Sequence, residues 1–268
     1  MGRLLSLAAG VTPELAADPV SFVTSAADAG WAAAGVWHDP DSWTPATTAA
    51  VRRRLDDTGL QPLDVEVIRL GPDGDTGDAV VDIAAALGAR NVLAISSFDD
   101  AGRTADRLGE LCRRARPSGV RVCLEFMRFT AVRTLADALD VVGRVAEPDV
   151  GILVDQLHVH RSGTTFPEIR AADPALFPYV QWCDGPAEPA GWSTREIVTD
   201  ALDARAAPGD GELPVHEFAA LFDDAVPFSL EVRSRALREG WPDPTDRARV
   251  LLQRTEAAVA SGGGPARH

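Results

Sequence analysis

Acidic and amide side chains end four apolar runs in the second half of the chain. Glu125 closes VCLE, Asp155 closes ILVD, Gln181 lies in YVQW and Glu231 closes SLE. An unpaired carboxylate beside an apolar run is costly, and a divalent cation removes that cost. Carboxylate and amide oxygens suit hard cations. We therefore expect one cation per chain at these four residues, Mn²⁺ or Mg²⁺ before Co²⁺ or Zn²⁺.

Each of these acids also has a simpler interpretation when it is taken alone. A single Asp or Glu at a strand end more often caps a helix or pairs with a nearby arginine. The metal site is favoured because the four residues follow four consecutive apolar runs. No single spacing among them is as specific as a Cys-x-x-Cys pair.

Other residue types near these positions could bind a substrate or move a proton. His158 lies three residues after Asp155, so its imidazole could turn back to the same edge and act as a proton donor. Arg205 precedes a glycine-rich segment and could hold a hydroxyl, carboxylate or phosphate group. The remaining candidates for substrate binding are Trp37, His38 and Asp184.

Short apolar runs that alternate with helical patterns must position these side chains. We expect strands over 4–8, 34–37, 63–68, 91–95, 121–125, 151–155, 179–183 and 228–232. Helical spacing falls at 19–29, 45–58, 78–87, 101–116, 135–145, 214–222 and 245–258. This α/β alternation predicts a single (β/α)8 TIM barrel, with a doubly wound sheet as the alternative.

The barrel is expected to fill residues 1–260 as one catalytic domain, followed by a flexible tail over 261–268. The Gly- and Asp-rich segment 71–77 is expected to be a loop near the barrel mouth. In TIM barrels the active site lies at the carboxyl ends of the strands. The four predicted metal ligands end the fifth to eighth strands, which places them together.

Composition excludes several classes of function. The 268 residues carry 26 basic and 40 acidic side chains, a net charge of −14, which disfavours nucleic acids and anionic membranes. Every basic residue is an arginine, so mechanisms that need a lysine amine are excluded. Three dispersed cysteines form no zinc or disulfide pattern. With no signal sequence or transmembrane run in view, we expect a cytoplasmic protein.

The strand-end pattern resembles the xylose isomerase-like TIM barrels, in particular the sugar phosphate isomerases/epimerases. The resemblance covers roughly residues 3–256 and is clearest in LEFMRF, VDQLHVHRSG, VQWCDGP, RAAPGDGELP and SLEV. It implies metal ligands at Glu125, Asp155, Gln181 and Glu231, with His158 and Arg205 beside them. Gln181 stands where the family usually has His, which favours Mg²⁺ or Mn²⁺ over zinc.

The resemblance implies a metal-dependent isomerase or epimerase of a sugar or keto-polyol that works through a metal-stabilised enediolate. Glu125 and Glu231 would exchange the proton next to the carbonyl. The alternatives are a dehydratase of the 3-dehydroshikimate or inosose type, with His158 as its acid, and a non-catalytic binding barrel. Substrate identity stays open, as does a homo-oligomeric state.

Overall fold

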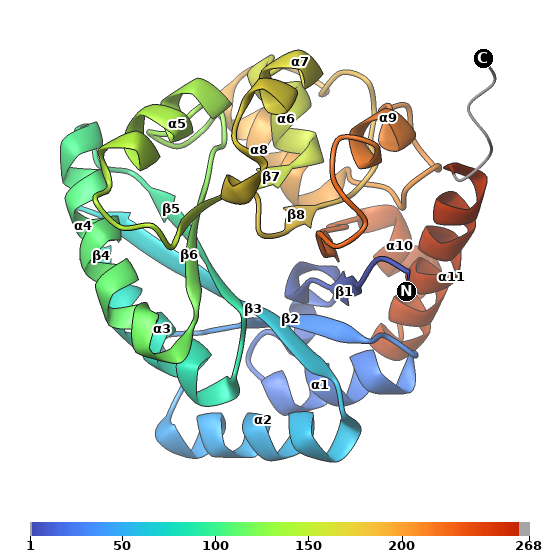
Figure 1. Cartoon of the computed structure of the whole chain (residues 1–268). Helices are drawn as coiled ribbons and strands as arrows, with labels where there is room; N and C mark the ends of the chain where they lie inside the picture. Colours follow the sequence, from blue (N-terminus) through green and yellow to red (C-terminus); the bar gives the residue numbers. More distant parts are fainter. Residues whose placement is uncertain (1, 263–268) are drawn as a thin grey trace.

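Eight parallel strands pair side by side and close into a barrel, and helices surround it (Figure 1). The computed structural model describes residues 2–262. Its barrel strands are β1 (Leu5–Leu7), β2 (Ala33–Trp37), β3 (Gln61–Gly71), β5 (Asn91–Ser96), β6 (Arg121–Glu125), β7 (Val150–Asp155), β8 (Val180–Gln181) and β9 (Phe228–Leu230). The pairing of β1 with both β2 and β9 closes the ring. The predicted TIM barrel is confirmed, and the doubly wound sheet is excluded.

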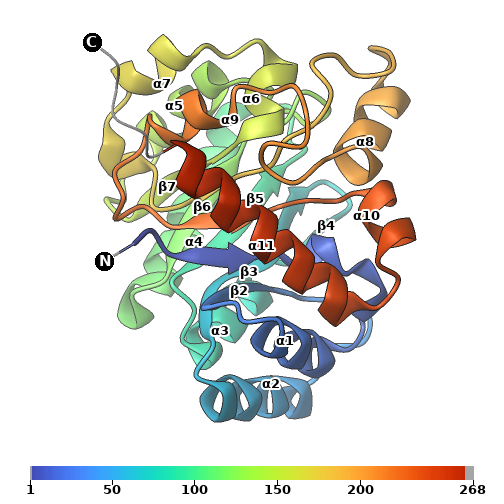
Figure 2. The same cartoon turned by 90° about the vertical axis from the view of Figure 1, so that its right-hand side faces the viewer.

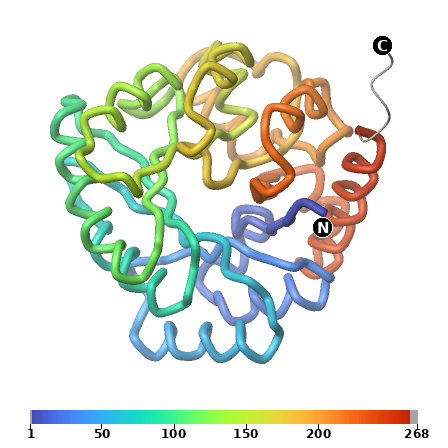
Figure 3. The backbone as a smooth tube through the Cα atoms, in the orientation of Figure 1, coloured from blue at the N-terminus to red at the C-terminus, as the bar shows by residue number. Residues whose placement is uncertain are grey.

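The helices lie outside the ring and return the chain from one strand to the next (Figures 1 and 3). They are α1 (Pro19–Asp28), α2 (Pro45–Thr58), α3 (Gly77–Leu87), α4 (Ala101–Ala115), α5 (Leu135–Arg144), α6 (Gln156–Ser162), α7 (Phe166–Ala171), α8 (Thr194–Asp203), α9 (Val215–Ala219), α10 (Arg235–Gly240) and α11 (Pro244–Gly262). Figure 2 shows α11 crossing the side of the barrel next to β1. Among these described helices, none has the length and apolar character needed to span a membrane.

Local sequence signals explain where several helices begin and end. The Thr44 hydroxyl accepts the backbone N–H of Thr47 and Pro45 occupies the first turn, which sets the start of α2. Gly59 ends that helix in the left-handed conformation, with φ of 70°. On α4 the apolar side chains recur at helical spacing and are buried toward the sheet.

Two apolar layers hold the barrel together. The larger layer lies between the strands and the surrounding helices. The smaller layer fills the barrel interior and comprises Ala33, Leu63, Leu93, Cys123, Leu153 and Tyr179. Side chains alternate between the two faces of a regular strand, so on β6, β7 and β8 the residue two positions after the interior residue also points inward. By this rule the side chains of Glu125, Asp155 and Gln181, two residues after Cys123, Leu153 and Tyr179, point into the barrel.

Some expected elements differ from the structure. Helices α6, α7, α8 and α10 were not predicted. Three of them, α6, α7 and α10, have only 7, 6 and 6 residues, too few for a clear helical pattern. The expected loop over 71–77 is partly wrong: β3 extends to Gly71, and β4 (Gly74–Asp75) pairs with it as an antiparallel hairpin. The expected tail over 261–268 is also partly wrong, since α11 continues to Gly262. Residues 263–268 lie outside the described part of the chain.

Candidate active site

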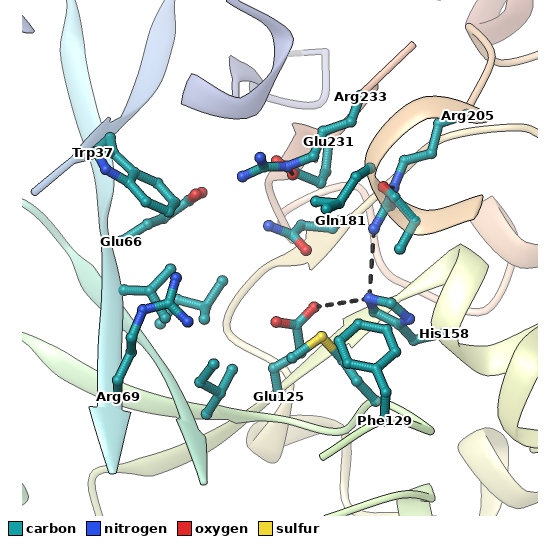
Figure 4. A pocket seen from close by; sticks show the side chains of 16 residues that line it. Trp37, Glu66, Arg69, Glu125, Phe129, His158, Gln181, Arg205, Glu231 and Arg233 are labelled. Atoms are coloured by element: carbon teal, nitrogen blue, oxygen red, sulfur yellow. Dashed lines mark hydrogen bonds and ion pairs between the residues drawn. The ribbon is translucent and has the colours of Figure 1, made fainter. Parts of the chain in front are cut away.

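A cavity of ≈ 180 Å³ opens at the carboxyl ends of the barrel strands (Figure 4). Three of the four predicted metal ligands, Glu125, Gln181 and Glu231, line it, and the fourth, Asp155, lies directly beneath. Of the other predicted residues, Trp37, His158 and Arg205 also line the cavity. The closed barrel brings these side chains together from β2, β6, β8, the start of α6, and the segments that follow α8 and β9.

Glu125, Asp155 and His158 form the tightest group of potential ligands. One ligand atom from each lies within 4.8 Å of the others, and all three side chains are buried. His158 Nε2 is 3.8 Å from Glu125 Oε1. Asp155 caps α6: its Oδ1 accepts the backbone N–H of His158 at 3.1 Å. The cap fixes the carboxylate and turns the first helical turn, with His158, toward the cavity.

The Gln181 side chain completes an oxygen-rich pocket. One atom of its amide lies 3.2 Å from Glu125 Oε1 and 3.1 Å from Asp155 Oδ2. With nitrogen at that position, the amide donates to both carboxylates. With oxygen there, three oxygens face one another and only a cation between them would be favourable. The amide can therefore serve the site in either state by rotating.

Arg205 is the buried positive charge of the site. Its Nη1 donates to Asp155 Oδ2 at 2.6 Å and lies 3.3 Å from Cys183 Sγ, while its Nη2 is 3.5 Å from His158 Nε2. Burial would raise the pKa of Asp155, but the guanidinium and the hydrogen bond from Arg205 hold it below its ordinary value. Asp155 therefore remains ionised.

The two other titratable groups beside Arg205 behave differently. Burial, together with the charge of Asp155, raises the pKa of Glu125 well above its ordinary value. Burial lowers the pKa of His158 to about 4, with a smaller contribution from Arg205. His158 is thus a neutral imidazole at pH 7, which can donate one hydrogen bond but carries no extra proton. This argues against its predicted use as a proton-donating acid.

Glu231 reaches the cavity from the opposite side, beside Arg233. Arg233 Nε donates to Glu231 Oε1 at 2.5 Å. The second oxygen, Glu231 Oε2, is buried and has no hydrogen-bond partner among residues 2–262. A buried oxygen without a donor is the kind of atom that a cation or a substrate hydroxyl would satisfy.

These observations test whether the residues suit the predicted cation. Glu125, Asp155, Gln181 and Glu231 offer carboxylate and amide oxygens, and His158 offers a neutral ring nitrogen. A cation would stabilise both the Glu231 oxygen that has no partner among the described residues and the closely spaced oxygens around Gln181. The donor set fits a divalent cation.

Two predicted substrate-binding residues lie away from this cavity. His38 follows Trp37 and therefore points to the other face of the strand, where it packs edge-on against Trp43 at 5.5 Å between ring centroids. Asp184 is buried under the glycine-rich loop, and its carboxylate accepts the backbone N–H groups of Gly209 and Gly211 at 3.0 and 2.9 Å. Asp184 therefore anchors this loop.

Three charged residues of the cavity were missed in the sequence: Glu66, Arg69 and Arg233. Glu66 and Arg69 come from β3, and Arg233 follows the last strand. The available signal was the spacing of Asp64 and Glu66 inside an apolar strand, which places both acids on one face. Trp37 lies near both arginines, with guanidinium carbons 6.0 Å (Arg69) and 5.6 Å (Arg233) from its ring centroid.

The chain is similar in sequence and in fold to known proteins. Over 119 residues the chain is 27% identical to an inosose isomerase of Halalkalibacterium halodurans, and the match covers 44% of this chain and 40% of that relative. The chain thus matches less than half the length of this relative.

Solved structures show the same fold over nearly the whole chain. A zinc-bound IOLI protein has a TM-score of 0.74 at 18% identity, covering 98% of each chain. A probable 3-DHS dehydratase, AsbF from Bacillus anthracis, has a TM-score of 0.70 at 16% identity, covering 92% of this chain and 98% of that one. The model of the xylose isomerase-like TIM barrel family matches residues 23–255. The chain belongs to the xylose isomerase-like TIM barrel family.

Proposed function

We propose that this protein is a divalent-metal-dependent isomerase or epimerase that acts on a sugar or keto-polyol. The observation that carries the proposal is that Glu125 and Glu231 enter one buried cavity from different strands (Figure 4). Two acids on separate walls can remove a proton from a carbon and return it. A cation bound by Glu125, Asp155, Gln181 and Glu231 would stabilise the negative charge that forms next to the carbonyl.

The residues of the chain divide the remaining work. One of Glu125 and Glu231 takes the proton from the carbon beside the carbonyl, and the other returns it. Neutral His158 donates a hydrogen bond to a substrate oxygen without adding charge. Arg205 keeps Asp155 ionised and in place through their 2.6 Å contact. Burial of all these groups excludes water and strengthens their interactions.

The substrate class rests on the cavity and on the relatives. The cavity admits a small molecule, and the indole of Trp37 offers an apolar wall for the carbon face of a ring. The relative from Halalkalibacterium acts, by its name, on inosose, a keto-polyol. Oxygen ligands and an amide in the third position favour Mn²⁺ or Mg²⁺, although the zinc in the related IOLI structure makes Zn²⁺ a necessary comparison.

The experiment pairs a metal assay with proton exchange. Protein purified without chelator should contain about one divalent cation per chain by mass spectrometry. In D2O, proton NMR should then show deuterium entering inosose or D-fructose at the carbon next to the carbonyl. EDTA-treated protein should lose this exchange and regain it with Mn²⁺.

Two results with the same samples would contradict the proposal. Metal-loaded protein that exchanges no proton on either compound would contradict the isomerase or epimerase assignment. A rise in absorbance from a conjugated product, with 3-dehydroshikimate as substrate, would instead identify a dehydratase.

A further inference from the structure

A second pair of acids lies inside the barrel on β3, apart from the predicted metal ligands. Asp64 and Glu66 are two residues apart and lie on one face of the strand. That face is the barrel interior, because Asp64 contacts Tyr179 of the interior layer and Glu66 lines the cavity. Asp64 is 0% exposed and Glu66 is 2% exposed. Glu66 lines the active-site cavity next to Trp37 (Figure 4), whereas Asp64 is not among the residues that line it.

The two carboxyl groups face each other across the space left by Gly35. A Cβ atom on Gly35 would lie 2.5 Å from Asp64 Oδ1 and 3.3 Å from Glu66 Oε1. Neither oxygen has a hydrogen-bond donor among the described residues. The other oxygen of Asp64 accepts the hydroxyl of Tyr179 at 3.2 Å. Two acceptor oxygens at such a place are stable only with a proton between them.

The environment assigns that proton to Glu66. Burial raises the pKa of Glu66 well above its ordinary value, and the neighbouring charges of Asp64 and Glu231 raise it further. The neighbouring carboxyl group of Asp64 is also buried, and burial raises its pKa to about 7. Arg233 offers only a partial counter-charge, because its Nε is hydrogen-bonded to Glu231.

A carboxyl group kept neutral in the wall of a cavity is a ready proton donor. No hydrogen bond from a described residue requires Glu66 to be there, and burying two acids side by side is unfavourable for folding. Replacing such a pair by neutral residues of similar shape would relieve that cost. The cost of the pair points to a role in chemistry.

We propose that Glu66 is a further catalytic residue, which carries a proton between two substrate oxygens during isomerisation, with Asp64 as its positioning residue. The proposal rests on the proposed function and makes it more specific. When a ketone moves to the neighbouring carbon, one oxygen gains a proton and the other loses one. In an epimerisation both oxygens keep their state, so this shuttle would have no task.

The step balances without any further reactant. The electron pair of the broken C–H bond moves into the carbon–carbon double bond of an enediol and then into the new C–H bond. Glu66 gives its proton to the carbonyl oxygen that becomes a hydroxyl. Its carboxylate then takes the proton of the hydroxyl that becomes the carbonyl, so Glu66 ends as it began.

The test separates proton exchange at carbon from migration of the ketone. Wild type and Glu66→Gln, both loaded with Mn²⁺, are incubated with inosose or D-fructose in D2O and followed by proton NMR. We expect Glu66→Gln to keep deuterium exchange within about threefold while isomerisation falls roughly 100-fold, the loss typical for one acid–base group. Asp64→Asn should lower isomerisation less, with KM unchanged.

A matched control variant changes a carboxylate far from the cavity. Glu110→Gln removes one exposed carboxylate from α4 and should change neither rate. The infrared difference spectrum between wild type and Glu66→Gln, without substrate, should contain the band of one protonated carboxyl group. Isomerisation by Glu66→Gln at the wild-type rate, or equal loss of exchange and isomerisation, would overturn the role of Glu66 alone. Wild type that exchanges no proton would overturn the proposed function itself.

Discussion

At the scale of single residues, the site separates acids by their surroundings. Asp155 meets the guanidinium of Arg205 and stays ionised, whereas Glu125, in the same pocket, has its pKa raised by burial. Glu231 shares one oxygen with Arg233 and leaves the other without a partner among the described residues. Asp155 and Glu125 thus differ in proton affinity within one pocket, which suits the proposed acid–base chemistry.

The first prediction concerns the two acids that would handle the carbon-bound proton. Glu125→Gln and Glu231→Gln should each lower deuterium exchange by roughly 10²- to 10⁴-fold, since an amide cannot take a proton. Circular dichroism should show an intact fold in both. Glu256→Gln, an exposed change on α11, is the matched control and should be fully active. Exchange near the wild-type rate in both cavity variants would refute their roles.

The second prediction concerns Arg205, whose positive charge neutralises the buried carboxylate of Asp155. Arg205→Met leaves a buried carboxylate unpaired, so the free energy of unfolding of metal-free protein should fall by about 3–5 kcal/mol. Mn²⁺ should recover part of this loss, because the cation and Arg205 act on the same carboxylate. Urea unfolding with EDTA or with Mn²⁺ measures both effects.

The control for Arg205 is a second buried ion pair outside the cavity. Arg161 Nε donates to Asp200 Oδ2 at 2.7 Å, and both side chains are buried. Arg161→Met should destabilise the protein similarly, yet gain nothing extra from Mn²⁺. An equal gain in the two variants would show that the cation does not bind at Asp155.

At the scale of strands and loops, much of the site was predictable from apolar runs. All eight strands lie where the sequence placed them, and three of the four predicted strand-end ligands line one cavity, with Asp155 beside it. This works because the carboxyl ends of parallel strands share one edge of the barrel. His38 was predicted to line the cavity but points to the other face of the strand, because adjacent side chains alternate and Trp37 occupies the inner face.

Glu66 could not be found this way, because the register of β3 is irregular. Its pairing shifts opposite Ala34 and Gly35, and again between Val65 and Ile68. Such bulges change which side chains reach the barrel mouth, and apolar patterning does not encode them. The role of Asp184 was missed for another reason. Its carboxylate accepts backbone N–H groups more than 20 residues along the chain, and no local sequence pattern predicts such partners.

The third prediction follows from the loop that Asp184 holds. Its carboxylate also accepts the N–H groups of Gly185 and Leu213, so an Asn amide would set a donor against donors. Asp184→Asn should lower the free energy of unfolding by about 2–3 kcal/mol, independently of metal. Asp173→Asn, at an exposed cap, should cost below about 1 kcal/mol. Equal effects in thermal unfolding would contradict the anchor.

At the scale of the whole molecule, charge is sorted between surface and interior. On the surface, Arg107 of α4 pairs with Asp78 of the neighbouring helix α3, with Asp75 of β4 and with Glu110 of its own helix. The chain keeps a net charge of −14, yet Arg69, Arg205 and Arg233 gather at the cavity. The barrel therefore presents an acidic exterior and places positive groups at the cavity, where the proposed reaction would form negative charge.

The last prediction is a global consequence of the buried acid pair. Burial raises the pKa of Asp64 from 3.8 to about 7 in the folded protein. As the pH rises from about 4 to about 7, the unfolded chain releases this proton first, so the free energy of unfolding falls. Asp64→Asn carries no such proton. Its stability relative to wild type should increase by up to a few kcal/mol across this range and level off above pH 7.

Urea unfolding of metal-free protein at pH 5, 6, 7 and 8 measures this gap. Asp203→Asn is the control, because hydrogen bonds from Arg235 and Arg238 hold the pKa of Asp203 below its ordinary value. That variant's difference from wild type should therefore stay constant over the same pH range. A constant gap for Asp64→Asn as well would mean that Asp64 is already ionised in the folded barrel.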